Sequence, residues 1–359
     1  MKNIIKNITT LLFVWIFIGC SGGDNSYDGE NGLLSGITNT TSLDTSINEI
    51  YTQVILEDSK SAFIQSQILL QSIQALNANS SEGNLLQAQI EFKKLVLTYK
   101  RVEAVYVAGY NSDNMRDIAE FYLENFIKGS KAQDIGGDLD RVFSGEASLI
   151  ANSLKGITAL EYTLFGDNES VSVITTKMNG IRLTSALIMI DKISGHLLEI
   201  QEYYEETSTF SSDGEDSLSA LLNVLSQQSY NLRELRIGDG AGLTVKYQDN
   251  PSATRLEYYK SLYSLESIEE ILKTLKTVMD IGLTDIAALG NTSSEAEAIS
   301  SAIDDALSIT GSFSSTLESS LSNSKTTALY ETTRIIQNNI TALINGLNFT
   351  QDIIDADGD

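Results

Sequence analysis

Apolar side chains recur with a helical period along nearly the whole chain after residue 45. Two segments show it most clearly, with apolar residues at Ile47, Ile50, Val54, Ile64, Ile68, Ile73 and Leu76, then at Leu86, Ile90, Leu95, Val96, Tyr99, Val102 and Tyr106. Most of these steps are three, four or their sums, which place side chains on one face of a helix, whereas a half-buried strand alternates at every second residue. No segment of any length alternates in that way. The pattern predicts an all-α protein.

Further helical segments are predicted over 113–128, 146–165, 170–206, 215–236, 253–281, 294–320 and 324–347. Turn residues cluster between them at 136–138, 166–168, 211–214 and 238–242. Thr292 and Glu295 have capping-box spacing, which predicts a helix start there. The single proline of the chain leaves little to interrupt long helices. We therefore expect up-and-down helices in two bundles packed together.

The predicted folded part is longer than one typical domain. We place a first helical bundle at residues 45–210 and a second at 211–350. Residues 351–359 form an acidic tail, whose Asp355, Asp357 and Asp359 imitate the start of a calcium loop without its remaining ligands.

The first 20 residues have the parts of a bacterial lipoprotein signal. Lys2 and Lys6 precede an apolar run over 11–18, and Gly19 and Cys20 follow. The run is shorter than the ~20 residues that cross a bilayer. We predict a signal peptide over 1–19, a lipid on Cys20 that anchors the chain to a membrane, and a long flexible linker over 20–44, rich in Gly, Ser, Asp and Thr. The alternative is a plain signal peptide with an incidental cysteine.

Composition limits which cellular compartments and which kinds of partner are expected. Cys20 is the only cysteine, so the mature chain has no disulfide framework. With 48 acidic and 24 basic residues the net charge is −24, which argues against nucleic acid and against an anionic membrane surface as partners. Ser21 stands where an aspartate commonly retains a lipoprotein at the inner membrane. We therefore expect a cell-envelope protein, held at the outer membrane of a two-membrane bacterium. The sequence names no protein partner.

Glu103 is the first candidate for chemistry. It lies between Tyr99 and Tyr106 on one predicted helix face that continues to Tyr110. A buried carboxylate on an apolar face must be hydrogen-bonded or paired. Two interpretations are open: a ligand pocket lined by Tyr99, Glu103 and Tyr106, or a satisfied structural network. Arg101 points away from this face and is expected to form an ion pair.

A second candidate is the stretch Lys155–Gly166, which matches a known motif at six positions: Gly156, Glu161, Tyr162, Leu164, Phe165 and Gly166. Here the chain resembles the imelysin family, which includes insulin-cleaving membrane proteases and iron-regulated envelope proteins. That family carries a glycine, any residue, a histidine, two residues and a glutamate. Thr158 stands at the histidine position in this chain.

Two other stretches extend the resemblance over roughly residues 45–350. Residues 92–104 are similar to the family's early helix, with Phe92 where a tryptophan is usual. Residues 236–261 are similar to its glycine-rich loop and the helix after it. One hypothesis is a ligand pocket lined by Tyr99, Glu103, Tyr106, Gly156, Thr158 and Glu161, and the alternative is a satisfied structural network of the same polar groups.

The exchange of histidine for threonine changes the expected chemistry. A His and a Glu at i and i+3 can share a metal ion, whereas a threonine hydroxyl is a poor ligand and no general base near neutral pH. The only histidine, His196, forms another His-x-x-Glu with Glu199, but none of the motif's flanking residues surround it. We interpret that pair as incidental. Any metal site would depend on carboxylates such as Glu103 and Glu161, which favours a hard cation such as Ca²⁺, Mg²⁺ or ferric iron.

Three functions follow as hypotheses. The first is a non-enzymatic lipoprotein that binds a small ligand or a metal ion and is linked to iron uptake. The second is a peptidase of the imelysin type, or its inactive relative. The third is a structural, partner-binding envelope protein. Whether the protein is an enzyme is left open, with the missing motif histidine arguing against it.

Overall fold

The computed structural model describes residues 40–124, 126 and 135–351. That part of the chain is helical and contains no strand, which confirms the predicted fold class. The predicted signal peptide, Cys20, most of the linker and nearly all of the acidic tail lie outside the described residues. None of the described helices has the length and apolar character needed to cross a membrane.

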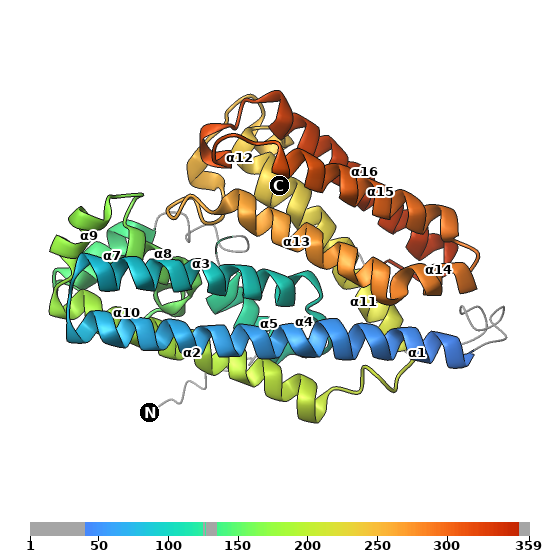
Figure 1. Cartoon of the computed structure of the whole chain (residues 1–359), viewed down its shortest axis with the longest axis horizontal. Coiled ribbons are helices and arrows are strands. Elements are labelled where there is room, and N and C mark those ends of the chain that lie inside the picture. Colours follow the sequence, from blue (N-terminus) through green and yellow to red (C-terminus); the bar gives the residue numbers. More distant parts are fainter. Residues whose placement is uncertain (1–39, 125, 127–134, 352–359) are drawn as a thin grey trace, which may run out of the picture.

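Three long helices form the first bundle. The helix α1 (Thr40–Ile50) continues through the π-turn η2 (Tyr51–Ile55) into α2 (Leu56–Ala78), and α3 (Glu82–Ala104) and α10 (Gly180–Glu202) pack along α2. The Ser81 side chain accepts a hydrogen bond from the Asn84 backbone and caps α3. Figure 1 shows α3 between α2 on one side and α13 of the second bundle on the other.

Shorter elements cover this bundle or, in the case of η6, continue one of its long helices. They are α4 (Val107–Asn111), α5 (Asp113–Ile118), η3 (Ala119–Leu123), α7 (Ile135–Phe143), η5 (Asn152–Lys155), α8 (Ile157–Phe165), α9 (Val171–Lys177) and η6 (Tyr203–Thr207). The helix α8 is buried along its whole length. Arg182 of α10 donates to the backbone oxygens of Tyr162 and Thr163, at 3.0 Å each, and so caps the C-terminal end of α8.

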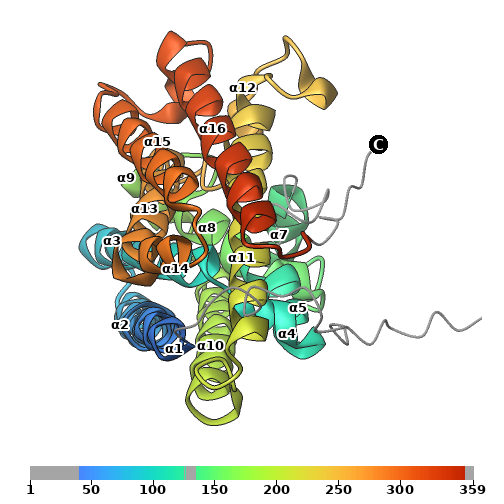
Figure 2. The same cartoon turned by 90° about the vertical axis from the view of Figure 1, so that its right-hand side faces the viewer.

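The second bundle contains four longer helical segments and the turns between them. It comprises α11 (Glu215–Tyr230), η7 (Asn231–Gly238), α12 (Asp239–Ala241), η8 (Val245–Tyr247), η9 (Ala253–Arg255), α13 (Ser264–Val278), η10 (Met279–Leu283), α14 (Thr284–Leu289), α15 (Ser293–Gly311), η11 (Leu317–Ser319) and α16 (Ser324–Gly346). Figure 2 shows α11 beside α16, and α15 packs along both α13 and α16.

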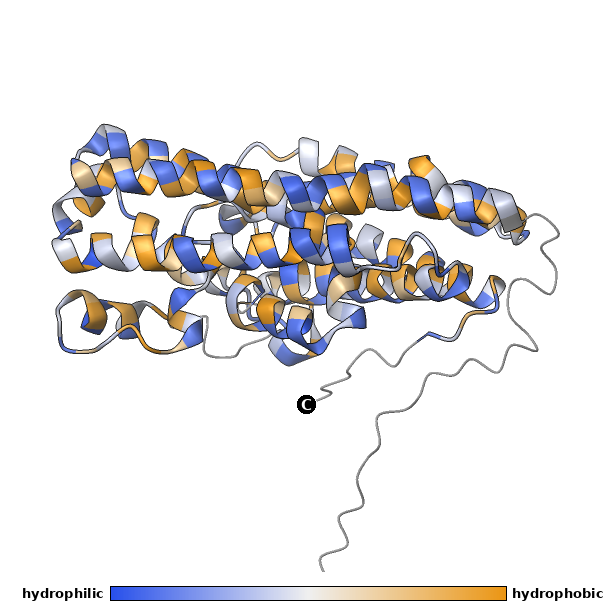
Figure 3. Cartoon of the chain, turned by 90° about the horizontal axis from the view of Figure 1, so that it is seen from below, coloured by the Kyte–Doolittle hydropathy of each residue, from blue (hydrophilic) through white to orange (hydrophobic). Residues whose placement is uncertain are grey.

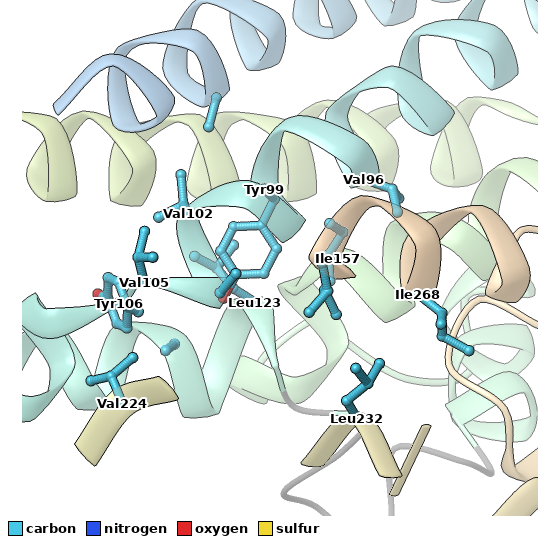
Figure 4. Packing of buried hydrophobic residues seen from close by; sticks show 14 of the residues in the cluster. Val96, Tyr99, Val102, Val105, Tyr106, Leu123, Ile157, Val224, Leu232 and Ile268 are labelled. Carbon is cyan, nitrogen blue, oxygen red and sulfur yellow. The ribbon is translucent and has the colours of Figure 1, made fainter. Parts of the chain in front are cut away.

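One apolar core runs through both bundles. Polar and apolar residues alternate around the long helices, as the sequence pattern requires (Figure 3). The buried residues form a single cluster that reaches from Leu43 to Phe349. Where the bundles meet, Tyr99 of α3 lies among Ile157 of α8, Leu232 of η7 and Ile268 of α13 (Figure 4). The boundary near residue 211 stays a prediction, because the core itself does not divide there.

Several predicted boundaries are wrong. Residues 136–138, predicted as a break, lie inside α7, where Leu139, Val142 and Phe143 supply the buried face. Residues 146–156 precede α8, and residues 256–263 form turns before α13 begins at Ser264. The helix α15 does begin after Thr292, but the Thr292 hydroxyl donates to the Ala287 backbone oxygen and forms no capping box.

Candidate functional site

Four charged side chains are buried together where the two bundles meet. Lys100 and Glu103 come from α3, Arg236 from η7, and Glu257 from the turns before α13; none is more than 3% exposed. Lys100 Nζ lies 2.5 Å from Glu103 Oε2 and 2.8 Å from the Glu257 carboxylate. Arg236 donates through Nη2 to Glu103 Oε1, and its Nε lies 3.1 Å from Glu257 Oε2. Each cation thus contacts both carboxylates, and we call these four residues the junction cluster.

Because the junction cluster is buried, the close pairing of its charges determines whether it is stable. Moving four charges out of water costs several kcal/mol per ion, which close pairing must offset. Burial by itself opposes the charge of Arg236, yet Glu103 and Glu257 together raise the pKa of its guanidinium above the usual value. Arg236 is therefore charged, and the cluster connects α3 of the first bundle to η7 and the 256–263 turns of the second.

Two buried donors at the junction cluster have no hydrogen-bond partner among the described residues. They are Nη1 of Arg236 and the hydroxyl of Tyr258, whose side chains are 1% and 2% exposed. The neighbouring Tyr99 hydroxyl, by contrast, donates to Glu124 Oε1 at 3.1 Å. A buried polar group without a partner costs about 1–3 kcal/mol. The junction therefore contains two donors whose hydrogen-bonding capacity the described protein atoms do not use.

Glu161 forms a second contact between the bundles. Its Oε1 accepts hydrogen bonds from the backbone nitrogen of Ser261 at 2.9 Å and from the Ser261 hydroxyl at 2.6 Å. The Glu161 side chain is 1% exposed, and burial raises the pKa of its carboxyl to about 7 although the bonds from Ser261 oppose the shift. Thr158 lies one turn earlier on α8 and is 3% exposed.

Glycine and backbone conformation explain how these residues reach the site. A Cβ on Gly156, the residue before α8, would lie 2.4 Å from the Tyr122 backbone oxygen, so only glycine permits this close approach. Tyr258 and Leu262 have φ values of 62° and 52°, in a region that side chains rarely adopt. These two turns point Glu257 toward α3 and bring Ser261 to Glu161. Lys260, 2% exposed, contacts Asp167 at 3.1 Å.

Comparison with known proteins places the chain in a family. The family model described as Imelysin matches residues 58–348, which is most of the chain. The chain belongs to the imelysin family. An imelysin-like protein from Psychrobacter arcticum 273-4 superposes with a TM-score of 0.71 at 16% identity, covering 88% of this chain and 98% of its own. No curated protein matches the sequence.

A second solved structure has the same fold. It is described as an iron-regulated protein A precursor from Parabacteroides distasonis ATCC 8503, with a TM-score of 0.69 and 12% identity, covering 86% of this chain and 95% of its own. At these identities the two structures establish the imelysin fold of this chain and leave its ligand open.

The imelysin fold brings some of the predicted site residues together and separates others. Tyr99 and Glu103 lie at the junction, as expected of a pocket or network there. Glu161 and Thr158 lie on α8, where Glu161 contacts the other end of the same 256–263 turns. The predicted continuous face through Tyr110 is wrong, because α3 ends at Ala104 and Tyr106 precedes the separate helix α4. The Tyr106 hydroxyl donates to the Met115 backbone oxygen at 2.9 Å.

The proposed metal ligands have other partners. Both oxygens of Glu103 contact cations, and Glu161 Oε1 accepts from Ser261. A metal ion shared by these two carboxylates would have to displace Lys100 or Arg236. Among the described residues no group of three or more His, Cys, Asp or Glu side chains is arranged to hold a metal ion. The residues at the junction therefore do not fit a bare cation.

Arg101 forms its predicted ion pairs, 3.2 Å from Asp58 and 3.3 Å from Glu270.

Sequence reasoning missed four residues of this site: Lys100, Arg236, Glu257 and Ser261. All four lie in the stretches that carry the family resemblance, 92–104 and 236–261. For Lys100, Arg236 and Glu257 the available signal was a charged side chain within a family-like segment, whereas Ser261 is uncharged. Glu103 and Arg236 are 133 positions apart along the chain, and Lys100 and Glu257 are 157 apart. No local spacing in the sequence therefore reveals these pairs.

Proposed function

We propose that this imelysin-family protein is a non-enzymatic binding lipoprotein of the cell envelope and that it binds an oxygen-rich ligand at the junction of its two bundles. The observation that carries the proposal is a pair of buried donors, Arg236 Nη1 and the Tyr258 hydroxyl, that no described residue accepts from. Carboxylate, carbonyl or hydroxyl oxygens of a ligand would accept from both groups.

Iron uptake is the process to which we link this binding. A structural relative is described as an iron-regulated protein, and donors such as Arg and Tyr suit the oxygens of an iron chelate better than a bare ion. The side chains of the junction cluster pack against one another and leave no room for a chelate. A chelate can therefore bind only if the two bundles separate at the junction. The bonds that would open are those of Glu161 to Ser261 and of Glu103 to Arg236.

The proposal is tested by measuring the binding of ferric citrate to the full chain by equilibrium dialysis. Tyr258→Phe removes the unused hydroxyl and keeps the ring. We expect it to weaken binding about fivefold to tenfold, the value of one hydrogen bond. Without ligand the variant should be as stable as the parent or more so. Tyr106→Phe is the matched control, because that hydroxyl is already bonded to Met115.

The outcomes separate binding from structure. Binding by the parent that Tyr258→Phe weakens and Tyr106→Phe leaves unchanged supports the proposal. No binding by the parent, or equal binding by both variants, overturns it. A Tyr258→Phe variant that is less stable without ligand would also argue against it, because the hydroxyl would then have a partner in the free protein.

The envelope location depends on Cys20, which lies outside the described residues. We expect labelled palmitate to be incorporated into the expressed precursor and to follow the outer-membrane fraction. Cys20→Ala should abolish the label and release the protein in soluble form. Labelling of the variant, or a soluble parent, would contradict a lipid anchor at this cysteine.

One observation favours the peptidase alternative. The Ser261 hydroxyl lies 2.6 Å from a carboxyl whose pKa is raised to about 7, and a serine beside a base is the arrangement of an activated nucleophile. Ser261 is 4% exposed, so a substrate would need the same parting of the bundles. Cleavage of unfolded casein by the parent, abolished in both Ser261→Ala and Glu161→Gln, would establish this function in place of binding.

A further inference from the structure

Residues 61–90 differ in composition from the rest of the chain. They contain one charged residue, Glu82, whereas 20% of the whole chain is charged. This segment forms the end of the hairpin in which α2 leads into α3. Figure 2 shows α2 on the outside of the first bundle, with α3 and α10 on either side of it. The outer surface of this hairpin is therefore almost free of charge, in a protein whose net charge is −24.

Four large aliphatic side chains on the same hairpin are exposed. Ile64 and Ile68 of α2 are 59% and 39% exposed, and Leu86 and Ile90 of α3 are 48% and 41% exposed. Eleven large apolar side chains are exposed across the described residues, and these four share two helices that pack against each other. Scattered exposed apolar residues need no explanation, but a patch of them marks an interaction surface. We call the exposed surface of residues 61–90 the hairpin face.

The outward positions of α2 have the spacing of a coiled-coil seam. Steps of three and four alternate along one stripe, which contains Ser61, Ile64, Ile68, Gln71 and Ala75. A stripe with this spacing packs against a second helix that has the same spacing. The helices α3 and α10 pack along the other sides of α2, whereas this stripe faces solvent. The hairpin face thus has the pattern of a helix-packing surface and lacks the second helix.

Charge indicates which partner fits the hairpin face. Two copies of a chain with a net charge of −24 repel each other, and the repulsion is least where both present an uncharged surface. The α2 stripe also complements itself when two copies run antiparallel, because Ile64 of one copy then lies opposite Ile68 of the second. Glu57, the next residue of the stripe, lies opposite Ala75 and meets no like charge. A different protein would be selected by a charge pattern, which this face lacks.

We propose that two copies of this protein associate through the hairpin face, with their α2 helices antiparallel about a two-fold axis. Each contact then occurs twice, and α2 and α3 of both copies form a four-helix arrangement. The face is about 30 Å long by the rise of α2 and about 20 Å wide across two packed helices, so about 1,200 Å² is buried in total. That area is at the lower end of specific interfaces. Attachment of both copies to one membrane, as proposed for Cys20, favours the pairing by raising their effective concentration.

Disulfide cross-linking of the full chain in the cell envelope tests the proposal. Two differently tagged copies are expressed together, one with Ser61→Cys and the other with Gln71→Cys, at positions that face each other across the antiparallel seam. We expect oxidation to cross-link the mixed dimer. Two Ser61→Cys copies should not cross-link, because about 15 Å separates these positions along the seam. The parent, whose one cysteine is Cys20, gives the background.

A charge placed on the hairpin face should prevent the association. Adding Ile64→Glu to both tagged copies should lower the yield of mixed dimer at least about tenfold, because each copy loses a buried aliphatic side chain from the interface. Ile64 is exposed, so the fold of each copy is kept. Ile335→Glu is the matched control, since Ile335 is 47% exposed on α16 and lies outside the hairpin face. It should leave the yield unchanged.

Four results would overturn the proposed dimer. The first is a mixed-dimer yield no higher than the background, and the second is an equal loss of yield in Ile64→Glu and Ile335→Glu. The third is a cross-link of Ser61→Cys to itself or to another protein in place of the mixed dimer. The fourth is protection of the uncross-linked Ser61→Cys thiol from a membrane-impermeant maleimide, which would assign the hairpin face to the lipid surface.

Discussion

Glu103 shows how far a single residue can be interpreted from sequence. Its place on an apolar helix face predicts burial and the need for partners, and the structure gives it Lys100 from its own helix and Arg236 from the other bundle. The i+3 spacing of Lys100 and Glu103 is visible in the sequence. The contact to Arg236 is not, because it depends on how two bundles pack. The need for a partner was predictable, and the distant partner was not.

Removing one member of the junction cluster should be costly. We expect Glu103→Gln to lower the free energy of unfolding by about 3–5 kcal/mol, because it leaves Arg236 and Lys100 buried with a single shared carboxylate. Urea denaturation measures the change. Glu331→Gln is the control, since its pair with Arg334 is about half exposed and such pairs contribute under about 1 kcal/mol. Similar losses in both variants would show that burial adds nothing to the cluster.

Glu161 should make stability depend on pH in a defined window. Burial raises the pKa of its carboxyl from 4.5 to about 7. Between these values the unfolded chain loses the proton and the folded protein keeps it, so stability falls as pH rises. The contribution is fully present below about pH 4.5 and is lost by about pH 7, on the order of 3 kcal/mol.

The measurement compares the parent with Glu161→Gln across pH 4–8. The stability of the parent relative to the variant should fall over this window and then level off above pH 7. Asp58, whose pKa burial raises to about 6, titrates in both proteins and cancels in the difference. A difference that does not change with pH would show that Glu161 is ionised throughout.

At the level of elements, periodicity predicts long helices well and short ones poorly. The extent of α2 and α3 follows from this period, but their buried faces follow only in part, because Ile64 and Ile68 of α2 and Leu86 and Ile90 of α3 are exposed. The helix α7 was missed because Gly136 and Gly137 resemble a turn, although its buried face is packed by tertiary contacts. The 256–263 segment was predicted helical because its spacing is helix-like. Positive φ values at Tyr258 and Leu262, which the site needs, break that helix.

Gly156, just before α8, and Gly195, inside α10, should respond in opposite ways to alanine. Gly156→Ala places a Cβ 2.4 Å from the Tyr122 backbone, which forces α8 away from η3, and we expect a loss of at least about 2 kcal/mol. Gly195 lies inside α10 with no atom near its missing Cβ, and Gly195→Ala should add about 0.5–1 kcal/mol. Thermal unfolding of both variants tests the pair. A neutral Gly156→Ala would contradict the close approach that positions Glu161.

For the whole molecule, the sequence predicts two bundles but not how tightly they are joined. Composition and length favour a division near residue 211. The structure adds a single apolar core, a buried junction cluster and the Glu161 contact, and none of these follows from a pattern within one bundle. The same junction contains the unused donors of Arg236 and Tyr258. The stability of the protein and the proposed ligand binding therefore depend on the same interface between the two bundles.

If the junction joins the bundles as described, they should unfold together. We expect a single urea transition in the full chain, with coincident midpoints for far-ultraviolet circular dichroism, which follows the helices, and near-ultraviolet circular dichroism, which follows the buried tyrosines. Glu103→Gln should split or broaden that transition, because it weakens the contact between bundles more than either bundle itself. Two separate transitions in the parent would show instead that residues 45–210 and 211–350 are independent domains. An open junction would then require little free energy.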